Sequence, residues 1–235
     1  MKPSFLFSLI FSSLFPFWVL AQYPAGFGDE IVHDEFSYPA GILFGSETTT
    51  YVYELDGKVW SIEEGVVSES PLIDISEEVG FWADHGLISA VLDPNFSKNG
   101  YIYLLYNVDR HHLLHFGTDG YDSEIDDEFQ GGMGRITRYT IDQISSNTVI
   151  PNSRRILLGE SPGTGIPIAA QGHGAGALLF GEDGSLLVST GDGNTHSCCY
   201  NGEGPIPSAG YDDISFKDGV LSENELLGVF RAQFI

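Results

Sequence analysis

The sequence predicts an all-β protein, and three features carry this prediction. Glycine occurs 29 times, phenylalanine and tyrosine occur 16 and 11 times, and lysine and arginine together occur only 10 times. Aromatic residues favour strands and glycine favours turns. Two dipeptides, Asp56-Gly57 and Asp183-Gly184, separate short apolar runs, which is a pattern typical of β-hairpins. We therefore expect short strands joined by tight turns.

The N-terminal residues 1–21 have the pattern of a secretory signal peptide. Lys2 precedes a long apolar stretch from Phe5 to Leu20, and Val19 and Ala21 are small enough for cleavage after Ala21. Pro16 and the serines shorten the apolar core, which argues against a membrane anchor. We expect a periplasmic or secreted protein that begins at residue 22 and has no stable membrane insertion after cleavage.

Residues 23–109 contain a regular series of strand patterns. Asp56-Gly57 and Asn99-Gly100 mark turns between them. The expected strands are Ile42–Phe44, Tyr51–Leu55, Lys58–Ile62, Pro71–Ile75, Leu87–Leu92 and Tyr101–Tyr106. Residues 23–80 are expected to be scaffold.

The stretch from Arg110 to Met133 is the least regular part of the chain. It contains His111, His112 and His115, followed by a dense acidic cluster. The acidic residues are Asp122, Glu124, Asp126, Asp127 and Glu128. They lack the spacing of an EF-hand, and the histidines lack the spacing of a zinc protease. We expect a long solvated loop, followed by strands at Gly134–Ile141 and Arg154–Leu158.

The apolar runs Ala177–Phe180 and Leu186–Val188 predict a hairpin with His173 and Asp192 at its open end. If Asp183-Gly184 forms a two-residue loop, Asp192 faces Ala175 and His173 faces Asn194. His173 and Asp192 are then diagonal neighbours, roughly 7–8 Å apart at Cα. A histidine beside a carboxylate is a plausible acid–base pair. The alternative is a hydrogen-bonded structural histidine at the entry to a strand.

Three blocks of sequence carry a resemblance to a known family. They are HGLISAVLDPNFSKNGYIYLLYNVD (residues 85–109), GRITRY (134–139) and HGAGALLFGEDGSLLVSTGDG (173–193). The three blocks, in this order, resemble those of the glucose/sorbosone dehydrogenase family of soluble quinoproteins. The resemblance covers about residues 40–200. It implies a six-bladed β-propeller, of which this chain would cover roughly the first half. We interpret residues 22–235 as a partial propeller domain of an N-terminal fragment.

The same resemblance implies an activity. Family members use pyrroloquinoline quinone (PQQ) and Ca²⁺ to oxidise an aldose or related sugar to a lactone or carbonyl, and they pass electrons to an external acceptor. His173 would be the base and a cofactor contact, and Asp192 would orient it. Asp84 stands where family members often carry Gln or Glu near the sugar and the quinone. The Ca²⁺ ligands and the cations that hold the quinone are expected beyond this chain, so the fragment alone should be inactive.

Other possibilities remain open. A non-catalytic extracellular ligand-binding propeller or a calcium-dependent lactonase would fit a similar fold. Substitution of His173 would distinguish the lactonase from the dehydrogenase, because a lactonase that holds its metal by carboxylates should survive it. The net charge of −23 argues against nucleic acid as a partner. His85 is either a pocket neighbour or, as we expect, a solvated loop residue. Cys198 and Cys199 could bond to each other or to cysteines elsewhere, and residues 224–231 could form a short helix or lead into a strand.

Overall fold

The computed structural model describes residues 24, 26–128, 132–143, 147–168, 174–191 and 230–231. The chain divides into two units, Met1–Glu35 and Phe36–Ile235. In the first unit, His33 Nδ1 lies 3.3 Å from Glu35 Oε2, and the predicted signal peptide, residues 1–21, lies outside the described residues. Among the described residues, no helix is long and apolar enough to cross a membrane.

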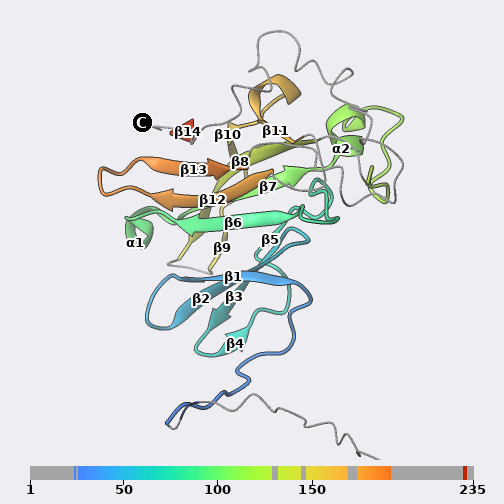
Figure 1. The fold of residues 1–235 in the computed structure, drawn as a ribbon. Helices are drawn as coiled ribbons and strands as arrows, with labels where there is room; N and C mark the ends of the chain where they lie inside the picture. The colour runs from blue at the N-terminus through green and yellow to red at the C-terminus, as the bar shows by residue number, and fades with distance from the viewer. Residues whose placement is uncertain are drawn as a thin grey trace, which may run out of the picture. The chain divides into compact units, whose positions relative to one another are not determined.

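Strand β7 (Tyr101–Val108) organises the second unit because it is buried on both faces. Alternate side chains of a strand point to opposite sides. Leu104 and Tyr106 lie in one hydrophobic core with residues of the first sheet. Tyr103 and Leu105 lie in another core with residues of the third sheet. The sheet that contains β7 therefore packs face to face between two others (Figure 1).

The first sheet has five strands in the order β1-β2-β3-β4, with β5 also paired to β3. Its strands are β1 (Pro39–Phe44), β2 (Thr49–Glu54), β3 (Lys58–Glu63), β4 (Val66–Val67) and β5 (Ile73–Asp74). All pairs are antiparallel. The chain therefore forms a meander here, as the alternating pattern predicted.

The second sheet has six strands in the order β10-β8-β7-β6, and β9 and β11 also pair with β8. Besides β7, its strands are β6 (Leu87–Leu92), β8 (Gly132–Asp142), β9 (Thr148–Val149), β10 (Arg155–Leu158) and β11 (Ile166–Ile168). Because β8 is long, its outer edge is covered in three pieces by β9, β10 and β11.

The third sheet contains β12 (Ala175–Phe180), β13 (Leu186–Thr190) and β14 (Phe230–Arg231). Phe230 and Arg231 pair with β13 as a strand, and residues 224–229 of the segment that the sequence left open lie outside the described residues. The described helices are short: α1 (Phe96–Asn99), α2 (Arg110–His115) and the 3₁₀ turn η1 (Pro162–Thr164).

The predicted strands are confirmed, with boundaries shifted by a few residues, and the all-β class is confirmed with them. The sequence did not indicate the two-residue strands β4 and β9, the short strand β11, or the single turn α1. Each of these is too short to show a period of its own, because a repeat of two needs several residues to be visible.

Both Asp-Gly hairpin turns are present, but the two-residue loop assumed for Asp183-Gly184 is wrong. Gly181 N donates to Ser185 O and Gly184 N donates to Gly181 O, so the loop holds three residues, Glu182, Asp183 and Gly184. Only the glycine has positive φ, at 80°. A three-residue loop that ends on a left-handed glycine also matches the strand twist. Gly57, with φ 99°, ends a loop of the same kind.

Candidate functional site

Asp84 lies on a tight turn that leads into β6. His85 N donates to Trp82 O at 2.9 Å, and Ala83 has φ 48°, so the chain reverses directly before the strand. Asp84 is exposed at the tip of this turn. A carboxylate in this position is free of the core and can meet a ligand, so Asp84 remains a candidate contact.

Both ends of this turn are held by the main chain of Asn107, near the end of β7. Gly80 N donates to Asn107 O at 3.0 Å, and Asn107 N donates to Gly86 O at 3.0 Å. We call residues 80–86 the Asp84 loop. Its position is therefore fixed relative to the second sheet.

His85 is not the solvated residue that the sequence suggested. It is buried, and its ring centroid lies 4.0 Å from that of Trp82. This contact is not visible in the sequence because the ring contact depends on the reversal at Ala83. His85 therefore packs against Trp82 within the Asp84 loop.

The hairpin β12–β13 brings together the two segments that adjoin His173 and Asp192 in the sequence. Ala175 faces Thr190, so the predicted pairing of Ala175 with Asp192 is wrong. The cause is the longer turn together with a β-bulge between Ala175 and Leu178. His173 and Asp192 themselves lie outside the described residues. Their sequence neighbours Gly174 and Gly191 are paired, with Gly191 N donating to Gly174 O at 2.7 Å.

The start of β12 lies at the same end of the unit as the Asp84 loop. Leu178 N donates to Ser89 Oγ at 3.0 Å, which joins β12 to β6. A second contact lies nearer the start of β12. Gly134 pairs with Asn107, and a Cβ placed on Gly134 would lie 3.6 Å from the Cβ of Ala175. Strands β6 and β12 therefore run side by side in the same direction (Figure 1). The Asp84 loop and the open end of the β12–β13 hairpin therefore lie at the same end of the sheets.

The predicted solvated loop after β7 is wrong in its first part, which forms α2. Asp109 is buried and caps this helix, accepting from His112 N at 3.2 Å and from Asp127 N at 3.0 Å. Burial raises the pKa of Asp109. His111 is also buried, and its Nε2 accepts from Asp122 N at 3.2 Å. The acidic residues that follow are mostly exposed, as expected.

A buried carboxylate, Glu78, ties this helix to the second sheet. It accepts from Arg154 Nη2 at 2.6 and 2.8 Å, from Arg135 Nη1 at 3.4 Å, and from the hydroxyl of Tyr106. His112 Nε2 lies 3.6 Å from Glu78 Oε2. Burial lowers the pKa of His112, whereas burial and the neighbouring Glu78 raise the pKa of Tyr106. No sequence motif connects these residues, so the sequence alone does not predict that they meet.

A quinone with carboxylate groups, or a calcium ion, would need partners that this part of the chain does not offer together. Arg135 and Arg154 are committed to Glu78, and Arg110 is buried and has an interaction of its own. Within the described ranges, no three His, Cys, Asp or Glu residues are arranged to hold a metal ion. The described residues therefore do not fit either group by themselves.

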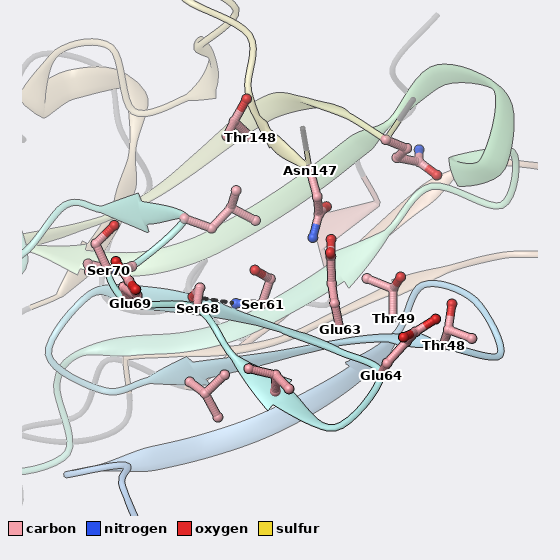
Figure 2. Close-up of a pocket in the computed structure, with 15 residues that line it drawn as sticks. Thr48, Thr49, Ser61, Glu63, Glu64, Ser68, Glu69, Ser70, Asn147 and Thr148 are labelled. Carbon is pink, nitrogen blue, oxygen red and sulfur yellow. Dashed lines mark hydrogen bonds between the residues drawn. The ribbon is translucent and has the colours of Figure 1, made fainter. Parts of the chain in front are cut away.

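A hollow of about 800 Å³ lies between the first sheet and the start of β9. Hydroxyl, amide and carboxyl groups line much of it, and Figure 2 shows Glu63 and Asn147 pointing toward each other across it. The register puts it at the other end of the second sheet from the Asp84 loop, because Tyr101 pairs with Thr140 while Val108 pairs with Met133. It is thus separate from the candidate site.

Comparison with known proteins agrees with this architecture. A solved glucose dehydrogenase matches with a TM-score of 0.51 at 14% identity, over 69% of this chain and 41% of that one. The PQQ-bound aldose sugar dehydrogenase of Streptomyces coelicolor matches with a TM-score of 0.48 at 18% identity, over 70% of this chain and 41% of that one. The chain is an all-β protein that covers part of a β-propeller.

The sequence places the chain in a family. Residues 36–203 match the Glucose / Sorbosone dehydrogenase family model, so the chain belongs to that family. Among curated proteins it is similar to the human Hedgehog-interacting protein, with 25% identity over 162 residues, which are 66% of this chain and 21% of that protein. The chain thus spans about a fifth of the length of this relative.

Proposed function

We propose that the protein oxidises a hydroxyl group of an aldose or a related sugar to a lactone or carbonyl, with His173 as the base. Membership of the Glucose / Sorbosone dehydrogenase family carries this proposal. The paired glycines Gly174 and Gly191 support it, because they stand next to His173 and Asp192 in the sequence. The Asp84 loop at the same end of the sheets supplies a further polar contact for the sugar.

The two proposed catalytic side chains have complementary roles. A neutral imidazole, with an ordinary pKa near 6.5, accepts the proton of the sugar hydroxyl at one ring nitrogen near neutral pH. A carboxylate at the other nitrogen orients the ring and stabilises the imidazolium that forms. In this proposal Asp192 is that carboxylate and His173 is that imidazole.

PQQ is the proposed electron acceptor at the site, with Ca²⁺ bound beside it, and an external acceptor would reoxidise the quinone. When bound, the quinone would supply two-electron oxidation. Its carboxylates and the calcium ion would be held by groups other than the described residues. Asp84 and His173 are the proposed contacts from this chain. Export follows in the proposal from the signal-peptide pattern of residues 1–21.

The test is dye-linked oxidation of a sugar panel by the full-length protein, with and without PQQ and Ca²⁺. His173→Ala should abolish quinone-dependent activity. His33→Ala is the matched control, because His33 belongs to the first unit and contacts Glu35. Activity that persists in His173→Ala would contradict the role of His173 as the base. A folded wild-type protein without quinone-dependent activity would contradict the proposal that the protein is an enzyme of this kind.

A ligand-binding propeller without catalysis is the second candidate. The similarity to the Hedgehog-interacting protein favours it, since the name of that relative denotes binding of another protein. A binding propeller would keep its partner affinity in His173→Ala and would not respond to PQQ. The same pair of variants therefore distinguishes the two candidates.

A further inference from the structure

Asn107 carries a buried polar atom that the fold does not use. Its side chain is only 2% exposed, and within the described part of the chain its Oδ1 has no hydrogen-bond partner. Buried amide oxygens in native proteins are nearly always paired, because an unpaired one loses its hydration without compensation. An oxygen of this kind indicates a partner that arrives from elsewhere.

The position of Asn107 points to the candidate site. The residue pairs with Gly134 across the β7–β8 ladder, so its side chain lies on the face that also carries Tyr103 and Leu105. A Cβ on Gly134 would be 3.1 Å from Ile166 and 3.6 Å from Ala175. The amide therefore lies near the start of β12, between the second and third sheets.

The main chain of Asn107 already has a separate structural role. Its N–H and C=O hold the two ends of the Asp84 loop, at Gly86 and Gly80. These bonds do not depend on the side chain. A leucine at this position would keep them and the branching of the side chain, although it is larger than asparagine, and would remove the amide. The role of the side-chain oxygen can therefore be tested without releasing the loop.

We propose that Asn107 Oδ1 accepts a hydrogen bond from one hydroxyl group of the bound sugar and so helps to select it. The proposal rests on the sugar-oxidising function proposed above. Asn107 Oδ1 is screened from bulk water, so water competes only weakly for this acceptor. A neutral hydroxyl group is therefore a favourable donor to it. A ligand lacking that hydroxyl would leave the oxygen unpaired, which is how buried polar groups discriminate between substrates.

The experiment compares wild type, Asn107→Leu and the control Asn95→Leu in the full-length protein. Asn95 is exposed and lies at the other end of the second sheet. Thermal unfolding without ligand checks that each variant is folded, and D-glucose affinity is measured in the presence of PQQ and Ca²⁺. We expect folded Asn107→Leu to bind glucose about fivefold to tenfold more weakly than wild type. A panel of monodeoxy glucoses should contain one sugar that wild type and Asn107→Leu bind equally.

One result would overturn the inference. Equal glucose affinity in wild type and Asn107→Leu would show that no sugar hydroxyl meets Asn107 Oδ1. If wild type itself binds no sugar, the proposed function fails as well, and the two failures are thereby distinguished.

Discussion

Replacing Glu78 by glutamine tests whether a buried charge network holds the helix α2 and the second sheet together. The Glu78 side chain is 9% exposed and has two arginines, Arg135 and Arg154, as ion-pair partners. Arg135 is itself 8% exposed, whereas Arg154 is 36% exposed and can regain water. The substitution keeps the shape of the side chain and removes its charge.

The expected loss of stability comes mainly from Arg135. Breaking a buried ion pair by removing one partner costs about 3–5 kcal/mol, because the remaining charge is left buried without compensation. We expect Glu78→Gln to lie near the lower end, at about 3 kcal/mol, since the amide oxygen still accepts a hydrogen bond and Arg154 is partly hydrated.

Urea unfolding of the full-length protein at pH 7 measures this loss, with Glu47→Gln as the control because Glu47 is exposed. The double variant Glu78→Gln, Arg135→Gln should recover part of the loss, since the uncompensated charge is then removed as well. A loss below about 1 kcal/mol in Glu78→Gln would refute the reasoning, because that is the range of exposed ion pairs.

Two further predictions concern a glycine and a histidine. In the same urea assay, Gly100→Ala should lower the free energy of unfolding by more than about 3 kcal/mol, and Gly184→Ala by only about 1–2 kcal/mol. Both glycines have positive φ, but of the two only a Cβ at Gly100 would meet a backbone atom, 2.1 Å from Ile141 O. Equal losses in the two variants would contradict this. Burial lowers the pKa of His112 below its unfolded value near 6.5, so the stability it contributes is present above about pH 6.5 and is lost as the pH falls. The stability advantage of wild type over His112→Gln should therefore shrink by on the order of 1 kcal/mol between pH 7 and pH 5, and an advantage that grows on acidification would reverse the assigned shift.

Local patterns predicted the strands well. The strand predicted at residues 101–106 is confirmed by β7, whose side chains divide between two cores. The turn at Asp183-Gly184 was located correctly, but its length was not. Asp-Gly is compatible with both a two-residue and a three-residue loop, and the choice moves every pairing further along the hairpin.

The candidate site was predicted only in outline. The sequence blocks singled out Asp84, His173 and Asp192 through resemblance to a family, and the assignments of all three remain predictions. The structure adds that the Asp84 loop and the open end of the hairpin share one end of the sheets. It also adds Asn107, which the sequence presents as one more residue of a strand.

The sequence by itself determined the secondary structure class, the order of the strands and the family, because hydrophobic alternation, turn residues and ordered motifs are local signals. Only the tertiary structure decided which polar residues are buried together. Glu78, Arg135 and Arg154 lie far apart along the chain and meet only after the sheets have packed. Their pairing depends on burial and on distances in space, which no short stretch of sequence encodes.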